Sequence, residues 1–493
     1  MPRTARVCAA GLLLLGLAAR APAVAAPAAA LTLSPCELEH PLRLTVVAAE
    51  CGVLSVPENP GEPAGRHIGL RVARVAAISR RKRADPLFVL AGGPGQAAGA
   101  FYATVAPAFA RILRERDIVL VDQRGTGGSN RLDCPQQEEL LEGASDAEIA
   151  ASTRACLATL AGRAEVAWYT TSIAVQDLER VRAALGYQRI NLYGGSYGTR
   201  VAQHYLRRFA PHVRSLILDG VVPVERVLGP EIAIEAERAL LAVLGRCGAE
   251  PACRSRFGDP VEDYRAVRRA LAARAVPVSV PDPQNGRPTH LELGSEQLAT
   301  VLRLLTYSAD YAALLPLVLH AAAQADYAPL AAQFLTVERS YREALAVGMH
   351  HSVVCAEDVP FFAARAIDRA QLAATYLGTT QLDGLTVVCR IWPHGPVDAD
   401  LHDPLASDAP ALLLSGGDDP VTPPEYAVQA AHAFRHSRAL TLAGFGHGQL
   451  TAPCLDRVMA EFLARASVDG LDVSCTRAAR PLPFFTSVNG PPP

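Results

Sequence analysis

The sequence lacks the features that mark several classes of protein. Its formal net charge is only −2 at pH 7, so it has no basic excess that would attract nucleic acid or an anionic membrane. Past the N-terminal region, no stretch reaches the roughly 18 apolar residues of a membrane-spanning helix. The chain has no Cys-x-x-Cys motif, which leaves little support for structural zinc. We therefore expect no nucleic-acid partner, no membrane partner and no metal.

The N-terminus has the pattern of a secretory signal peptide. Arg3 and Arg6 precede the apolar run 7–19, and the small residues 23–26 follow. Signal peptides have this order of basic, apolar and small-residue segments, and they are removed from the mature protein. The sequence predicts a signal peptide over residues 1–26 and export to the periplasm or the extracellular space.

The cysteine content fits export. One of the 11 cysteines, Cys8, lies in the predicted signal peptide, and 11 − 1 leaves an even number. Paired cysteines are typical of oxidising compartments. Although the count leaves other connectivities open, pairing neighbours along the chain predicts the following disulfides: Cys36–Cys51, Cys134–Cys156, Cys247–Cys253, Cys355–Cys389 and Cys454–Cys475.

Apolar strand patterns alternate with helical patterns along much of the chain. Two amphipathic strand patterns come first, and buried-strand patterns separated by helical patterns follow, at residues 51–57, 68–78, 86–91, 117–121, 190–193 and 215–218. This alternation predicts an α/β fold, a doubly wound and mostly parallel sheet with helices on both faces.

The alternation breaks in the second half of the chain. Residues 224–403 have mostly helical patterns, divided by the Pro-rich stretch 277–288, and strand patterns resume at 411–414 and 439–442. We predict a first core segment over residues 27–223, a helical insertion over 224–403 and a second core segment over 404–493.

One motif in the predicted sheet indicates a nucleophile. A short apolar strand runs into Gly194-x-Ser196-x-Gly198, and a helical pattern follows. This is the sequence form of a nucleophile elbow, a turn so tight that only small residues fit around the exposed serine. Because such a motif also arises by chance, the assignment of Ser196 depends on partners elsewhere in the chain.

Two residues after later strands supply those partners. Asp419 and His447 each follow a predicted strand, and the order Ser196, Asp419, His447 is the chain order of one serine-hydrolase fold. A neutral imidazole can take the serine proton, and the carboxylate can fix its tautomer. Asp418 is the rival acid, and the alternative for His447 is a surface histidine in a glycine loop.

The loop at residues 92–95, Gly-Gly-Pro-Gly, predicts an oxyanion hole. It follows a buried strand, and in this type of site one backbone donor comes from such a loop and another from the residue after the nucleophile. Since Pro94 has no N–H, we expect the donors to be Gly93, or a neighbouring glycine, and Tyr197.

Several motifs together resemble one branch of the α/β-hydrolases. They are residues 92–95 (Gly-Gly-Pro-Gly), 122–127 (Asp-Gln-Arg-Gly-Thr-Gly), 194–199 (Gly-Gly-Ser-Tyr-Gly-Thr) and 419–423 (Asp-Pro-Val-Thr-Pro). In this order they resemble the proline iminopeptidase and secreted tripeptidyl aminopeptidase family. Many relatives have His before the double glycine, where this chain has Ala91. The resemblance implies an α/β-hydrolase with a helical cap.

The resemblance also implies an activity. It indicates a secreted serine exopeptidase that removes proline or short peptides from the free N-termini of peptides, without metal or cofactor. An esterase or lipase-like hydrolase with the same triad is the main alternative, and a non-catalytic binding protein on the same scaffold is another. The sequence gives neither the preferred residues nor the oligomeric state.

An aminopeptidase also needs a group that binds the substrate ammonium. Glu357 and Asp358 are adjacent acids that follow an apolar run within the insertion, beside Cys355. A disulfide at Cys355 would hold their backbone, so we predict Glu357 and Asp358 as the substrate-binding acids. The alternative is that both merely favour the dipole at the start of a helix.

Overall fold

The computed structural model describes residue 1 and residues 31–135 and 144–491. Residues 2–26 of the predicted signal peptide lie outside these ranges, so the signal peptide stays a prediction.

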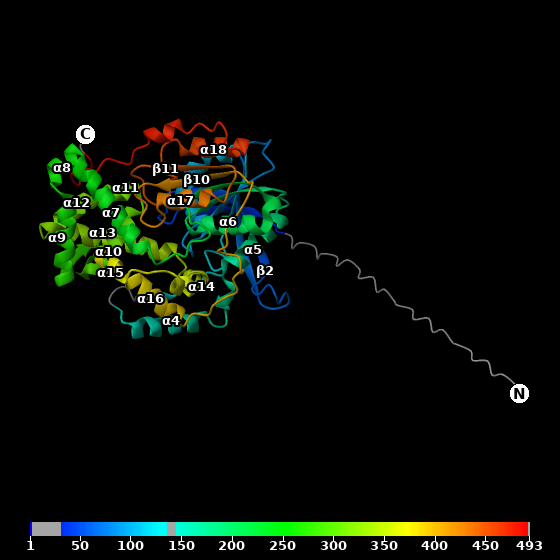
Figure 1. Ribbon diagram of the computed structural model, residues 1–493, viewed down its shortest axis with the longest axis horizontal. Helices are drawn as coiled ribbons and strands as arrows, with labels where there is room; N and C mark the ends of the chain where they lie inside the picture. Colours follow the sequence, from blue (N-terminus) through cyan, green and yellow to red (C-terminus); the bar gives the residue numbers. More distant parts are fainter. Residues whose placement is uncertain (2–30, 136–143, 492–493) are drawn as a thin grey trace.

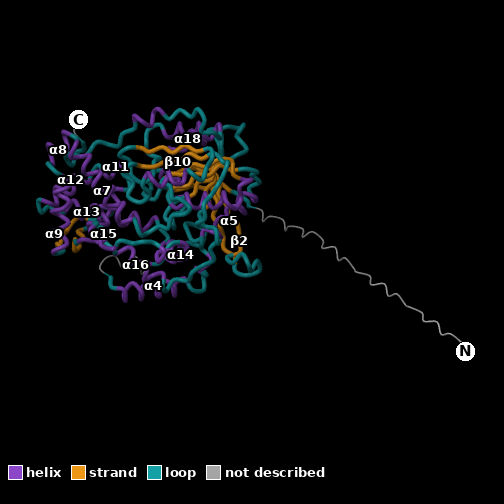
Figure 2. The backbone as a smooth tube through the Cα atoms, in the orientation of Figure 1, coloured by secondary structure: helices purple, strands orange, loops and turns teal. Residues whose placement is uncertain are grey.

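A nine-stranded sheet is the framework of the molecule, in the order β1-β2-β3-β5-β4-β6-β7-β10-β11. Figure 2 shows strands of this sheet in orange, with helices in purple around them. The strands from β5 to β11 in this order are parallel to their neighbours, whereas β1, β2 and β3 are antiparallel. The strands are β1 (Ser34–Glu39), β2 (Val46–Pro57), β3 (His67–Val75), β4 (Leu87–Leu90), β5 (Ile118–Val121), β6 (Ile190–Gly195), β7 (Val213–Asp219), β10 (Ala411–Gly416) and β11 (Ser437–Leu442). The predicted doubly wound, mostly parallel sheet is confirmed.

Helices cover both faces of this sheet. Those that lie outside the predicted insertion are α1 (Ala98–Val105), α2 (Ala110–Leu113), α4 (Asp146–Leu160), α5 (Thr171–Ala184), α6 (Tyr197–Phe209), α17 (Pro424–Ala431) and α18 (Leu455–Arg465). Short 3-10 helices lie at Ala106–Phe109, Val166–Trp168, Ala210–His212, Val359–Ala364 and Ser474–Ala478.

Alternate residues of the inner strands enter two separate hydrophobic cores. In β4, Phe88 and Leu90 pack with residues of α5, α6 and α17, whereas Leu87 and Val89 pack with residues of α1, α2 and α18. A strand buried on both faces has this continuous apolar sequence, which is why the inner strands could be predicted.

The helices of the predicted insertion fall into two groups. They are α7 (Ile232–Ala249), α8 (Pro251–Phe257), α9 (Pro260–Ala273), α10 (Ser295–Thr306), α11 (Ala309–Ala312), α12 (Leu315–Ala323), α13 (Ala328–Ala344), α14 (Val347–Glu357), α15 (Arg369–Ala374) and α16 (Thr380–Cys389). Most of α7 to α13 share a third core, and they lie together to one side of the sheet (Figure 1). By contrast, Met349 and Val353 of α14 and Val388 of α16 pack in a core of the sheet. The boundaries 224–403 stay a prediction.

The Pro-rich stretch of the insertion is a hairpin rather than a simple divider. Strands β8 (Val276–Pro281) and β9 (Pro288–Leu293) pair antiparallel within the stretch that the sequence analysis described only as dividing the helical patterns. Pro281 and Pro288 lie opposite each other at the turn end. Proline is tolerated at such positions because each strand of a two-stranded sheet has an unpaired edge.

Five disulfides join the pairs that the sequence predicts, Cys36–Cys51, Cys134–Cys156, Cys247–Cys253, Cys355–Cys389 and Cys454–Cys475. The predicted pairing is thus confirmed. Among the described helices, none is both long and apolar enough to cross a membrane.

Candidate active site

Ser196 lies in a strained turn between β6 and α6. Its φ is 55° and its ψ is −124°, a conformation that non-glycine residues rarely adopt. The flanking glycines explain how this turn fits. A Cβ at Gly194 would lie 2.4 Å from the Gly198 carbonyl oxygen, and a Cβ at Gly198 would lie 2.4 Å from that of Leu90. The geometry is that of a nucleophile elbow.

Asp419 is held by donors that orient its carboxylate toward His447. It is fully buried, and its Oδ1 accepts hydrogen bonds from the backbone N–H groups of Val421 and Thr422, both at 2.8 Å. Its Oδ2 lies 2.8 Å from Nδ1 of His447 and accepts a hydrogen bond from the Thr422 hydroxyl at 2.8 Å. The structure therefore brings the predicted acid and base together.

The rival acid has a different partner. Oδ2 of Asp418 lies 2.9 Å from Nη1 of Arg246, in an ion pair between the β10 loop and α7. The carboxylate that contacts His447 is thus that of Asp419.

Ser196, His447 and Gly93 line one cavity of about 640 Å³. Tyr307, which follows α10, lines the same cavity and was not predicted. Its ring lies edge-on to that of His447 with 5.2 Å between centroids, and its carbonyl accepts the His447 N–H at 2.6 Å. The helical insertion therefore forms one wall of the cavity.

A second carboxylate lies near His447. Asp219 ends β7 and also lines the cavity, and it accepts hydrogen bonds from the Tyr193 hydroxyl at 2.8 Å and the Gln449 N–H at 3.0 and 3.1 Å. Burial raises the pKa of Asp219 to about 6. Burial acts to lower the pKa of His447, but the charges and hydrogen bond of Asp419, together with the charge of Asp219, raise that pKa above its ordinary value.

The predicted oxyanion donors lie beside Ser196. Gly92 and Gly93 both line the cavity, and the Gly92 N–H donates to Oε1 of Gln96 at 3.3 Å. Tyr197 is the first residue of α6, so its N–H has no acceptor within that helix. Its side chain is turned into the core, where its hydroxyl lies 2.6 Å from that of Thr171. The assignment of Gly93 and Tyr197 stays a prediction.

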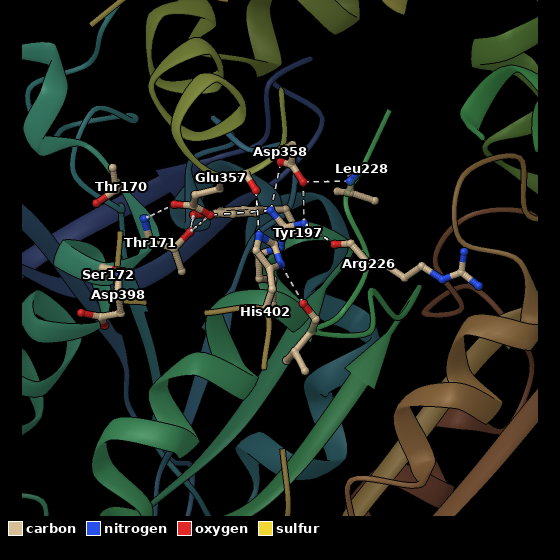
Figure 3. Close-up of polar contacts among 12 residues, drawn as sticks. Thr170, Thr171, Ser172, Tyr197, Arg226, Leu228, Glu357, Asp358, Asp398 and His402 are labelled. Carbon is tan, nitrogen blue, oxygen red and sulfur yellow. Dashed lines mark hydrogen bonds and ion pairs between the residues drawn. The ribbon is translucent and has the colours of Figure 1, made fainter. Parts of the chain in front are cut away.

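The structure does not bring Glu357 and Asp358 to this cavity. Both are buried to within 1% of full burial and lie at the end of α14. Figure 3 shows the two acids among their polar partners. Glu357 accepts hydrogen bonds from the Thr171 N–H at 2.6 Å and hydroxyl at 2.8 Å. Asp358 accepts two from Arg200, at 2.8 and 3.0 Å, and one from the Leu228 N–H at 2.8 Å.

These contacts give the two acids a structural role. Arg200 lies on α6, the helix that follows Ser196, so the acids join α14 to the nucleophile helix. Burial raises the pKa of Glu357 to about 7 against the opposing charge of Arg200. Because neither carboxylate lines the cavity, this geometry speaks against both as substrate anchors.

Within the described ranges, no three His, Cys, Asp or Glu side chains gather in a group that could hold a metal ion.

Comparison with known families agrees with the fold. Residues 85–241 match the family model of the alpha/beta hydrolase fold, and residues 374–475 match that of TAP-like proteins. The chain has the alpha/beta hydrolase fold. The resemblance to TAP-like proteins, stated from the motifs, is confirmed by the second match.

Several curated relatives have about the same sequence identity to this chain. It is 31% identical over 193 residues to a tripeptidyl aminopeptidase of Streptomyces lividans, covering 36% of each chain. It is 30% identical over 205 residues to the serine protease Hip1 of Mycobacterium bovis, covering 38% of this chain and 39% of the relative. It is 31% identical over 227 residues to carboxylesterase B of Mycobacterium tuberculosis, covering 42% and 43%. The chain thus spans well under half the length of these relatives.

Proposed function

We propose that this protein is a serine peptidase that acts through Ser196, His447 and Asp419. The observation that carries the proposal is the convergence of these residues. Ser196 and His447 line one cavity, and Asp419 contacts Nδ1 of His447. A carboxylate at Nδ1 favours the tautomer with its proton there, which leaves Nε2 as the base.

The chemistry follows from this arrangement. The Ser196 oxygen attacks the substrate carbonyl while Nε2 of His447 takes its proton, and the imidazolium is stabilised by Asp419. The same histidine then protonates the leaving group, and a water molecule repeats the sequence on the acyl-enzyme. The N–H groups of Gly93 and Tyr197 are proposed to stabilise the oxyanion.

The peptide substrate is proposed from the relatives. A tripeptidyl aminopeptidase and a serine protease are among them, which favours peptides over other acyl compounds. Cleavage from a free N-terminus rests on the aminopeptidase relative alone. Among the described residues, Asp219 is the one acid that lines the cavity of Ser196 and His447. Its carboxylate already accepts hydrogen bonds from Tyr193 and Gln449.

An esterase is the second candidate. It is favoured by the relative named carboxylesterase B, and ester hydrolysis would use the same acyl-enzyme chemistry.

Export is proposed on the predicted signal peptide and the five disulfides, because disulfides persist in oxidising compartments.

A paired assay separates these possibilities. We expect cleavage of a peptide with a free N-terminus, slower cleavage of its N-acetylated form and turnover of a p-nitrophenyl ester. Cleavage of the ester alone would favour the esterase, and equal cleavage of both peptides would remove the exopeptidase assignment.

Ser196→Ala tests the nucleophile itself. It should abolish labelling by a fluorophosphonate and lower turnover by at least about 10³-fold. The melting temperature should hardly change, because the side chains differ by one oxygen. Labelling that persists at another serine would show that Ser196 is not the nucleophile.

A further inference from the structure

A second cavity lies in the helical insertion next to the first. It has a volume of about 550 Å³ and is lined by residues of α9, α10, α13 and the segment after α15. Three residues, Arg303, Tyr341 and Gln381, line both cavities. The two therefore meet at these side chains, one turn of α10 away from Tyr307, which contacts His447.

Arg303 has little to neutralise its charge at this junction. Its Nη1 donates to Oε1 of Gln381 at 2.6 Å, and its Nη2 lies 3.5 Å from the Tyr307 hydroxyl. Both partners are neutral, and no carboxylate of the described ranges lies within ion-pair distance. A guanidinium has five donor positions in a planar fork that fits a carboxylate, so most of this capacity remains for a ligand.

The other cations of the second cavity have partners already. Arg268 donates to the carbonyl oxygens of Ala374 and Thr375 at 2.8 and 2.6 Å. Arg342 pairs with Glu338, which lies one turn before it on α13. Arg303 therefore differs from Arg342, which has a carboxylate partner, and its two neutral neighbours do not explain why a cation is placed there.

A buried hydroxyl group provides a second, independent observation. Tyr376 lines the same cavity and is only 9% exposed, yet its hydroxyl has no hydrogen-bond partner among the described residues. A buried polar group without a partner costs free energy. It is explained if a ligand in the cavity supplies an acceptor.

We propose that Arg303 selects substrates that carry a carboxylate, which it binds where the two cavities meet, with the adjoining part of the substrate in the second cavity. This proposal rests on the proposed serine hydrolase, whose nucleophile lies in the first cavity. The carboxylate is that of an acidic side chain or the C-terminus of a short peptide. Basic groups at this position are repelled by Arg303.

Two acids line the second cavity, and neither changes the positive charge at the junction of the two cavities. Glu338 is engaged by Arg342, and Glu296, in the first turn of α10, lines only the second cavity. Neither lines the first cavity, so the charge that a substrate meets at the junction is that of Arg303.

The test uses a series of short peptides with free N-termini. Each has Glu or Gln at one position at a time, and each is prepared as the C-terminal acid and the C-terminal amide. We expect wild-type kcat/KM to favour the carboxylate form at one position by about 10-fold or more, the ratio for one charge-assisted pair. Whether this position is a side chain or the C-terminus identifies the source of the carboxylate.

Variants at Arg303 then show whether this residue causes the preference for the carboxylate substrate. Arg303→Gln should bring the ratio of charged to neutral substrate close to one, with little loss on the neutral substrate, and Arg303→Lys should keep part of it. Arg339→Gln is the matched control, because it removes one charge from the same group of helices while Arg339 lines neither cavity and pairs with Asp282. It should keep the wild-type ratio.

Two results would overturn the proposal. One is a wild-type enzyme that does not distinguish the charged from the neutral member at any position. The other is an equal loss on both members in Arg303→Gln, which would mean that Arg303 only positions Tyr307. Melting temperatures of all variants show whether each one folds.

The same comparison with esters separates this proposal from the peptidase assignment. Mono-p-nitrophenyl esters of dicarboxylic acids are compared with the corresponding amide-capped esters. A preference for the acid that depends on Arg303, without peptide cleavage, would refute only the peptidase. Calorimetric binding of both series to Ser196→Ala gives the same comparison without turnover, and equal affinities would refute the role of Arg303.

Discussion

Ser196 reaches the cavity because glycines lie two positions before and after it, so residues without functional groups decide the geometry of the site. Gly194 and Gly198 each lie where a Cβ would overlap a backbone oxygen. The strain at Ser196 is retained because the surrounding sheet and helix over-determine the turn. Backbone groups also orient Asp419, whose carboxylate accepts hydrogen bonds from two backbone N–H groups.

Asp419 and Asp418 provide a test with adjacent residues. Asp419→Asn should lower kcat by about 10⁴-fold, because an amide favours the wrong tautomer of His447. Asp418→Asn should leave kcat within a few-fold, since Asp418 pairs with Arg246. Steady-state kinetics on one substrate measures both variants. If Asp418→Asn were the more damaging change, the acid of the triad would be misassigned.

Asp219 should affect the pH dependence of the reaction. Activity requires neutral His447, so kcat/KM should fall as the pH drops through the pKa of His447, which lies above its ordinary value. The negative charge of Asp219 stabilises the imidazolium and raises this pKa. Asp219→Asn should therefore move the acid limb of the profile to lower pH. An unchanged midpoint would show that the two groups are not coupled.

The placement of Ser196, Asp419 and His447 near one another could be predicted because each residue lies in a short motif at the end of a strand. The contacts of Glu357 and Asp358 could not. They depend on Arg200, which lies 158 positions from Asp358 in the sequence and has no motif that indicates this partner. Tyr307 and Arg303 were missed for the same reason, because only the folded position of α10 beside His447 brings them to the cavity.

Among the elements of the fold, α14 links the insertion to the catalytic machinery. Its first turn follows Ala346, whose N–H donates to the carbonyl of Gly95 in the predicted oxyanion loop at 3.0 Å. Its last residues contact Arg200 on α6. Both ends of one helix thus contact segments that flank Ser196, so we infer that α14 holds these segments in place.

The ion pair at the end of α14 should be important for stability. Asp358→Ala leaves Arg200 buried with its main partner removed, and we expect a loss of about 3–5 kcal/mol in the free energy of unfolding. The control is Asp408→Ala, which breaks an ion pair with Arg435 in which both side chains are more than 70% exposed. That change should cost less than about 1 kcal/mol. Urea titration of both variants measures the difference, and similar losses would contradict the assigned role.

The accuracy of the sequence analysis also differs between elements. Inner strands such as β4 were predicted because burial on both faces makes them continuously apolar. β1 was missed, since its pattern has a single buried residue, Leu38. The β8–β9 hairpin was missed because prolines mark it as irregular, and the two-stranded sheet tolerates them at its end.

At the scale of the whole molecule, the three largest hydrophobic cores of the described ranges are held together mainly by packing. None of the five disulfides in the described ranges joins the α7–α13 core to the sheet, because each closes a short local loop. The C-terminal segment makes this connection instead. Phe484 is 3% exposed and packs in the α7–α13 core, and the Phe485 N–H donates to the Ala313 carbonyl at 3.0 Å. The segment also lies beside α8, where Arg256 donates to the Thr486 carbonyl at 3.2 Å (Figure 1).

Phe484 should therefore stabilise the helical insertion from a distant part of the sequence. Phe484→Ala removes a buried ring against which the Arg246 guanidinium lies, 5.1 Å from its centroid. We expect a loss of about 3–5 kcal/mol, seen as faster hydrogen exchange in α7, α10 and α12, with exchange in β4 and β6 unchanged. Leu482→Ala, at a side chain that is 51% exposed, is the control and should change stability by less than about 0.5 kcal/mol.

Because Arg246 also pairs with Asp418, the residue before Asp419, loosening of the insertion should reach the catalytic loop. Uniformly faster exchange in the sheet as well would show instead that the three cores unfold as one unit.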